Sequence, residues 1–153
     1  MEPKDLAFEI ARIIDDRKGH DIAILDLRGI SDIAEFFVVA TGDNNRMVDA
    51  IVDEIENRLR PAGVFAYAIE GREDNTWDLM DFGSVIVHVF QPEARAFYRL
   101  ERLWGDAPRL EYEDGRVSEG ATVTPDRQSA DSESADRDAF DAALAAAEEL
   151  IEE

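Results

Sequence analysis

Histidine and carboxylate side chains are the residues of this sequence that could do chemistry, as metal ligands or as general acids and bases. The two histidines, His20 and His88, do not lie at the spacing of a metal-binding helix, and there is no cysteine, so no zinc site is predicted. His20 is expected in an exposed polar turn. His88 follows apolar residues of a predicted strand, and two interpretations stay open: a buried core histidine or a functional side chain.

Paired carboxylates would serve metal-dependent phosphoryl transfer if they projected from one face of a strand. Residues 1–110 contain no Asp-x-Asp, and Asp78 and Asp81, three apart on a predicted strand, are expected on opposite faces. Asp81-Phe82-Gly83 matches the metal-binding tripeptide of kinases, but no other kinase motif and no glycine-rich phosphate loop accompanies it. The sequence therefore predicts no catalytic residue, no metal and no cofactor.

Alternating helices and strands must position these side chains. Apolar periodicity predicts helices over 4–18, 48–59 and 92–104, with Gly19 at the position just after the first helix. The predicted strands are 22–27, 35–41, 64–69, 76–81 and 85–90. This order predicts an α+β fold of mixed α/β layers, in which a mixed sheet of about five strands is flanked by helices.

Charge divides the chain, which has 153 residues and a net charge of −20. Residues 1–105 hold 21 acidic and 12 basic side chains, whereas residues 106–153 hold 15 and 4. We expect a folded domain at 1–110 and a disordered acidic linker at 111–137, whose composition cannot bury enough apolar surface. Residues 138–153 form an acidic, alanine-rich tail with helical spacing, which we interpret either as a fraying helix or as a partner-binding helix.

The acidic balance also limits the kinds of partner. Phosphate contacts need clustered Lys and Arg, so little or no direct nucleic-acid binding is expected, and an anionic membrane surface is disfavoured in the same way. The first residues lack a basic and apolar leader, and the apolar runs are too short to span a membrane. We expect a cytoplasmic protein.

A set of large side chains remains as a candidate binding patch. Trp77, Leu79 and Asp81 share one face of their predicted strand, and Tyr98 and Glu101 lie within one turn of each other on the last helix. Trp and Tyr often anchor protein interfaces. The alternative is that Trp77 and Leu79 pack beneath a helix, and spacing alone leaves both interpretations open.

Several segments together resemble the ribosomal silencing factor (iojap-like, RsfS-type) family over about residues 4–107. The ordered run that carries the resemblance is Glu70–Gly71, Trp77–Gly83, Val85–Phe90 and Arg95–Trp104. Upstream matches are Asp21-Ile22, Asp26-Leu27, Phe37–Gly42 and Arg46. The resemblance implies a nucleotidyltransferase-like fold without catalytic acids, and it implies a regulator of translation and not an enzyme.

The resemblance further implies a translational repressor that binds the large ribosomal subunit through large-subunit protein fourteen and blocks association with the small subunit. Roles in ribosome biogenesis and a homodimer of the free protein are also implied. The residues expected to bind the ribosomal protein are Trp77, Leu79, Asp81, His88, Tyr98, Leu100 and Glu101. Two other functions stay open: a nucleotidyltransferase-fold enzyme and a dimerising adaptor module.

Overall fold

The structure is a computed structural model that describes residues 1–98, 108–113 and 116–119. Three helices, one short 3₁₀ helix and seven strands are described, in the order α1 (Pro3–Asp16), β1 (His20–Asp26), β2 (Phe36–Thr41), α2 (Asn45–Leu59), η1 (Arg60–Ala62), β3 (Ala68–Glu70), β4 (Trp77–Asp81), β5 (Val85–Phe90), α3 (Pro92–Tyr98), β6 (Arg109–Glu113) and β7 (Arg116–Glu119).

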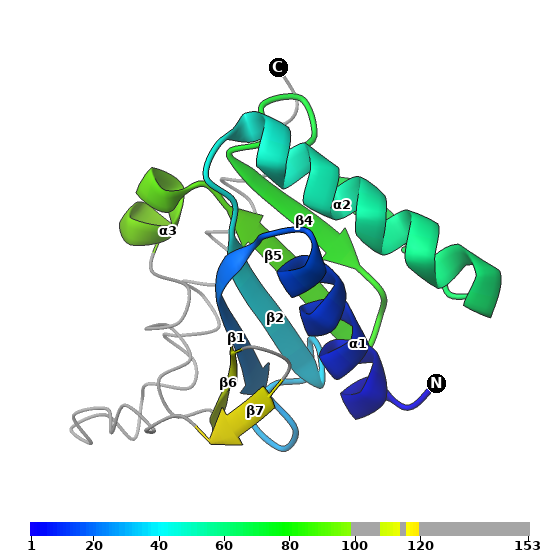
Figure 1. The fold of residues 1–153 in the computed structure, drawn as a ribbon. Helices are drawn as coiled ribbons and strands as arrows, with labels where there is room; N and C mark the ends of the chain where they lie inside the picture. Colours follow the sequence, from blue (N-terminus) through cyan, green and yellow to red (C-terminus); the bar gives the residue numbers. More distant parts are fainter. Residues whose placement is uncertain (99–107, 114–115, 120–153) are drawn as a thin grey trace.

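The strands form one mixed sheet in the order β3-β4-β5-β2-β1-β6-β7. Strands β2 and β5 run parallel at its centre, and every other neighbouring pair is antiparallel. Figure 1 shows α1 and α2 lying side by side across the sheet, with α3 at the end of β5. The five strands β1–β5 and their flanking helices confirm the predicted α+β fold class.

Side-chain alternation along the central strands builds two cores, one on each face of the sheet. Phe36 and Val38 of β2 pack with the apolar stripes of α1 and α2. Phe37 and Val39 point to the other face, where Ala94 of α3 packs. Every residue of β2 is buried, which explains its continuous apolar run in the sequence.

The third strand is shorter and later than the predicted 64–69. It spans only Ala68–Glu70, because Gly63 turns the chain with a φ of 75° and the backbone amide of Val64 donates to Leu59. Val64 and Ala66 then pack against the helix-side core before pairing with β4 begins. The packing of these two side chains thus replaces strand pairing over the first half of the predicted strand.

The first helix also ends differently from its prediction. Lys18, with a φ of 66°, takes the left-handed position that we expected Gly19 to fill. Gly19 instead donates its amide to the carbonyl of Ile14, and a Cβ at Gly19 would lie 2.3 Å from the Ile14 side chain. Close packing against Ile14 therefore explains why residue 19 is a glycine. A left-handed backbone conformation does not explain it.

Strands β6 and β7 were not predicted, and they occupy residues that the sequence assigned partly to a disordered linker. Their pairing with β1 and with each other carries the described sheet beyond residue 110. The domain boundary at 110 stays a prediction. Residues 99–104 of the expected last helix, and the tail at 138–153, lie outside the described residues. Within the described part, no helix is long and apolar enough to cross a membrane.

Candidate functional site

Trp77 lies at the centre of an aromatic cluster on the sheet face that α3 covers. Its ring is stacked on Phe90 with centroids 4.9 Å apart and lies 4.6 Å from the ring of Tyr98. Strand β4 supplies Trp77, β5 supplies Phe90, and α3 supplies Tyr98. Trp77 is only 4% exposed. The structure therefore brings Trp77 and Tyr98 into contact, but Trp77 is buried and Tyr98 of α3 packs over it.

His88 lies fully inside this cluster. Its ring meets Phe37 edge-on at 4.7 Å, and its Nδ1 accepts a hydrogen bond of 3.1 Å from the indole Nε1 of Trp77. Burial lowers the pKa of His88 to about 3, so the imidazole is neutral with its proton on Nε2. Of the two interpretations of His88, the structure supports the buried core histidine.

The exposed part of this region is formed by α3. Tyr98 is half-buried, and its neighbour Phe97 is 79% exposed, with the two rings packed edge-to-face at 5.1 Å. No role was predicted for Phe97, although its position next to Tyr98 on the same helix could have indicated one. Leu100 and Glu101, the other predicted helix contacts, lie outside the described residues.

Leu79 and Asp81 complete the predicted strand face. Leu79 is 5% exposed and belongs to the same core as Trp77. The Asp81 carboxylate, at the far end of β4, accepts a 2.7 Å hydrogen bond from the amide of Gly83 and so closes the turn into β5. Asp81 thus has a structural role in the hairpin and is only partly exposed.

A cluster of charged residues lies on the other side of β4, the side covered by α2. It was not predicted from the sequence. Arg72, from the β3–β4 loop, contacts three carboxylates of α2: Asp49 at 2.7 Å, Asp53 at 2.5 Å and Glu56 at 3.1 Å. Burial lowers the pKa of Arg72, but its hydrogen bonds to Asp49 and Asp53 outweigh this effect and raise it overall. The spacing of Asp49, Asp53 and Glu56 at i, i+4 and i+7 could have indicated from the sequence that these acidic residues share one face of α2.

Asp78 faces this cluster from inside the protein. It is fully buried, and neither carboxylate oxygen has a hydrogen-bond partner. Loss of solvation raises the pKa of Asp78 to about 7; Arg72 opposes that rise and Asp49 adds to it. Asp78 and Asp81 therefore lie on opposite faces of β4, as predicted, and cannot share a metal ion.

His20 has carboxylate neighbours of its own at the end of β1. Its ring nitrogens lie 2.6 Å from Asp43 and 3.1 Å from Asp21. Burial lowers the pKa of His20, but the hydrogen bonds to Asp43 and Asp21 outweigh this effect and raise it. Among the described residues no group of three or more His, Asp or Glu side chains is placed to hold a metal ion.

The Trp77–His88 hydrogen bond leads to a first prediction. In Trp77→Phe we expect a loss of about 2 kcal/mol in the free energy of unfolding, because the buried His88 acceptor loses its donor. Urea denaturation followed by far-ultraviolet circular dichroism would measure it. Phe97→Leu, which alters an exposed ring near the same cluster, should change stability by less than about 0.5 kcal/mol. An equally small effect of Trp77→Phe would show that the hydrogen bond contributes little.

Comparison with known proteins places these features in a family. The family model described as "Ribosomal silencing factor during starvation" matches residues 1–141 of the chain.

The chain belongs to the ribosomal silencing factor family.

Named family members from bacteria are similar to the chain over nearly their whole length. The ribosomal silencing factor of Halalkalibacterium halodurans is 39% identical over 113 residues, which is 74% of this chain and 97% of the relative. That of Bacillus subtilis is 37% identical over 115 residues, covering 75% and 98%. A crystal structure of a protein from Chromobacterium violaceum superposes with a TM-score of 0.67 at 33% identity, covering 82% of this chain and 98% of that one.

Membership in the ribosomal silencing factor family confirms the resemblance seen in the sequence. It supports a ribosome-associated role in translational silencing. The relatives are named as silencing factors, which are regulators.

Proposed function

We propose that this protein binds the large ribosomal subunit through large-subunit protein fourteen and blocks association with the small subunit, and that it also acts in ribosome biogenesis. The observation that carries the proposal is the family match over residues 1–141. A domain held at the face between the subunits needs only to occupy volume there. The proposed action therefore requires no catalytic residue, no metal and no cofactor.

The charge of the chain supports a protein contact on the ribosome. With a net charge of −20, the chain would be repelled by ribosomal RNA and attracted to a basic ribosomal protein. Electrostatic attraction of this kind raises the association rate and selects the partner more than it strengthens the final complex.

The proposed contact surface is centred on α3. Tyr98 and the exposed Phe97 offer aromatic rings to a partner, whereas Trp77, Leu79 and His88 are buried and would hold Tyr98 from below. This assignment revises the predicted roles of Trp77 and Leu79, from direct anchors to supports. Asp81, Leu100 and Glu101 remain proposed contacts.

Subunit association measured on sucrose gradients tests the proposal. With the full-length protein in excess over purified subunits, we expect the joined ribosome peak to fall and the protein to sediment with the large subunit. Undiminished joining at saturating protein, with no protein on the large subunit, would refute the proposal.

Variants of α3 test the contact surface. We expect Phe97→Ala with Tyr98→Ala to raise the Kd for the large subunit about 30-fold, or about 2 kcal/mol, as truncation of interface aromatics does. Asn57→Ala is the control, since Asn57 is an exposed, uncharged residue of α2, which packs on the other face of the sheet. Equal affinities for the α3 variant and the control would place the contact elsewhere.

The two alternative functions give different results in solution. Saturable binding of ATP with magnesium ions, together with unaffected subunit joining, would favour an enzyme on this fold. A dimer that survives in the presence of the large subunit would favour an adaptor module.

A further inference from the structure

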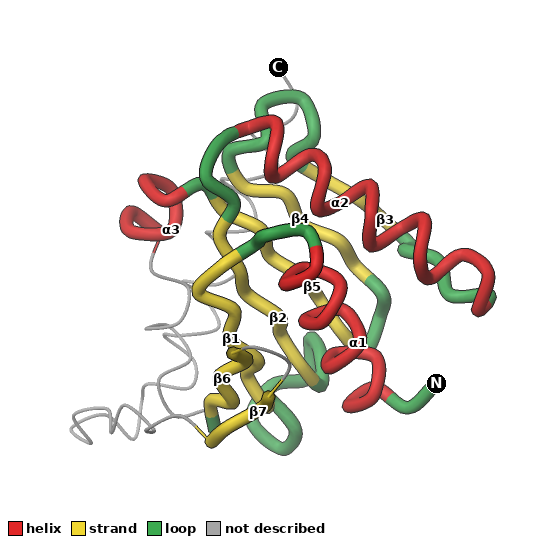
Figure 2. Tube along the Cα trace, viewed as in Figure 1, coloured by secondary structure: helices red, strands yellow, loops and turns green. Residues whose placement is uncertain are grey.

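Strand β3 forms one outer edge of the described sheet. Strand β3 pairs with β4 on one side and, among the described residues, has no strand on the other. Figure 2 shows β3 as the outermost yellow strand at this side of the sheet. The amide of Tyr67 donates a 2.7 Å hydrogen bond to Asp81, so the pairing begins one residue before the strand itself. Backbone groups on the outer side of this segment are placed to pair with an added strand.

Apart from the shortness of β3 and the charge of Glu70 at its end, the segment that leads into β3 carries few of the features that normally protect an edge. Residues 64–69 read Val-Phe-Ala-Tyr-Ala-Ile and contain no charge and no proline. Natural edge strands are usually guarded by lysine, proline, bulges or a covering segment, because open edges recruit other strands. Val64, Phe65, Tyr67 and Ile69 have high β-propensity, and an uncharged segment of this kind is also a hazard for aggregation when nothing covers it. An edge with so few protecting features is consistent with a binding surface.

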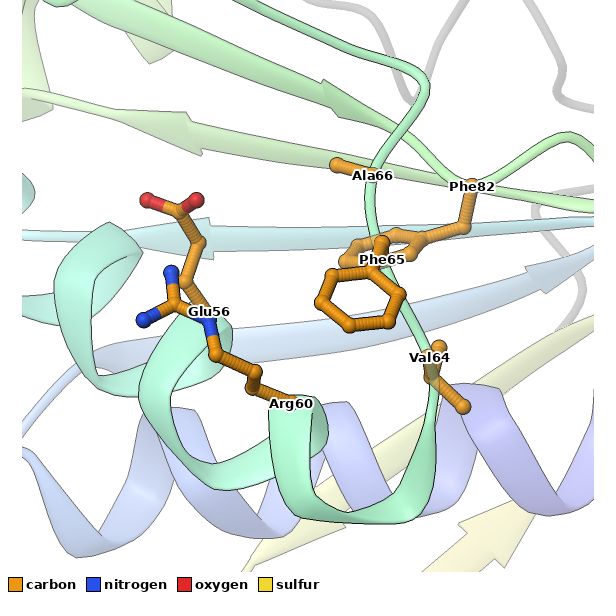
Figure 3. Close-up of a pocket in the computed structure, with 6 residues that line it drawn as sticks. All are labelled: Glu56, Arg60, Val64, Phe65, Ala66 and Phe82. Carbon is orange, nitrogen blue, oxygen red and sulfur yellow. The ribbon is translucent and has the colours of Figure 1, made fainter.

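Exposed aromatic side chains and a hollow adjoin the edge. Phe65 is 61% and Tyr67 is 83% exposed, two of the large apolar side chains most open to solvent in the described structure. A hollow of about 290 Å³, counted with the solvent at its mouth, lies between the end of α2 and this segment. Figure 3 shows Phe65 beside the hollow and Phe82 behind it, with Glu56 of α2 and Arg60 of η1 on the other side.

The charged side chains around the edge indicate what charge a partner would carry. Glu70 ends β3 and Asp81 lies opposite Ala68 on β4. Arg72 pairs with Asp49, Asp53 and Glu56 of α2, so this group keeps an excess of two negative charges, and the cation among the described residues that line the hollow is Arg60. The edge is therefore negative overall and complements Lys or Arg side chains.

We propose that the β3 edge binds an extended, basic segment of another protein, which adds a strand beside β3 and seats apolar side chains against Phe65 and Tyr67. Main-chain hydrogen bonds would supply affinity, and alternate side chains would supply specificity. An extended segment presents every second side chain to the same side, so an alternation of apolar and basic residues fits both the hollow and the carboxylates.

The acidic rim disfavours a second copy of this chain as the occupant, since two such edges would bring like charges together. The surface also differs from the α3 site. Trp77 and Asp81 lie at opposite ends of β4, about 13 Å apart at roughly 3.3 Å per residue. The β3 edge adjoins the Asp81 end, and α3 packs on Trp77. The two proposed surfaces share Asp81 and otherwise use different residues, so the peptide test and the subunit test can fail separately.

A synthetic peptide tests this inference on the full-length, ¹⁵N-labelled protein. The probe is an eight-residue peptide of alternating lysine and valine with blocked ends. We expect saturable binding that slows hydrogen exchange at the Ala68 and Glu70 amides at least tenfold. The same peptide with a central valine replaced by proline, and a peptide of alternating glutamate and valine, should bind at least tenfold more weakly.

Protein variants complete the test. The double variant Phe65→Ser, Tyr67→Ser should weaken peptide binding at least tenfold, and Ala68→Lys should do the same through charge repulsion. Phe97→Ser is the control for loss of an exposed aromatic ring and should leave binding unchanged. Equal binding of the glutamate peptide, exchange protection outside residues 67–70, or unchanged affinity in both edge variants would overturn the proposal.

Discussion

Replacing Asp78 with Asn is expected to stabilise the protein at pH 8 by as much as about 4 kcal/mol, and to leave its stability at pH 4 nearly unchanged. The buried carboxyl group has a pKa raised from 3.8 to about 7, chiefly because burial removes its solvation. At pH 8 the wild-type protein must hold this carboxylate charged and without a hydrogen-bond partner. Asparagine is neutral at every pH, so its burial never requires a charge to be held away from water.

The sign of the pH dependence follows from the raised pKa. Between pH 3.8 and about 7 the folded state holds a proton on Asp78 that the unfolded state has released. The contribution of Asp78 to stability is therefore complete below pH 3.8 and falls by about 1.4 kcal/mol per pH unit until the folded pKa is passed. Asp78→Asn should remove this fall.

Urea denaturation at half-unit steps from pH 5 to pH 8 would measure the effect as a difference between the two stability curves. Asp53→Asn is the matched control, because Asp53 contacts the same arginine but its side chain is 54% exposed. The curve of that control should run nearly parallel to the wild-type curve. A parallel curve for Asp78→Asn as well would mean that the buried carboxyl does not titrate in this range.

Arg72→Met is expected to destabilise the protein by about 3 kcal/mol at pH 8, and by less at pH 5. Arg72 is the cation that opposes four acidic side chains, of which Asp78 is fully buried. Without the guanidinium group, the three carboxylates of α2 repel one another, and the buried charge of Asp78 loses its favourable neighbour. At pH 5 Asp78 is protonated, so one part of the loss disappears.

A double-mutant cycle separates the two parts of this effect. In the background of Asp78→Asn, Arg72→Met should cost at least about 1 kcal/mol less than in the wild-type protein at pH 8. Arg58→Met is the control for loss of a surface ion pair, since Arg58 contacts the half-exposed Asp16 at 2.7 Å. That control should lie within about 1 kcal/mol of wild type. Additive effects of Arg72 and Asp78 would show that the two groups do not interact.

Much of the fold could be predicted because local patterns and tertiary packing agree in β2, β5 and α2. Their apolar runs and periodicity specify both the element and its buried face. Strand β3 could be placed only approximately, because Val64 and Ala66 have strand-like composition but pack against the core beside α2. Strands β6 and β7 could not be predicted, because their sequence is polar and their stability comes from pairing with β1 and with each other.

Some residues of the candidate site, such as Trp77 and Tyr98, could be indicated from the sequence, but whether each is buried or exposed could not. Alternation along β4 correctly placed Trp77 and Leu79 on one face, but it could not show that Tyr98 and its helix cover them. The pairing of Trp77 with His88 depends on the register between β4 and β5, which no single segment encodes. The contacts of Arg72 were missed for a similar reason, since a loop residue meets α2 only in the folded chain.

The pairing of β6 with β1 has a consequence for the order of folding during synthesis. Ile24 and Leu25 lie in the first strand to be made, and their outer neighbours are Leu110 and Arg109, made more than eighty residues later. A ribosome that synthesises this chain releases β1 early and completes its partner late. Until residues 109–113 emerge, the apolar strand has an unpaired side that invites contact with other nascent chains. The pairing of β6 with β1 thus removes this exposed edge only late in synthesis.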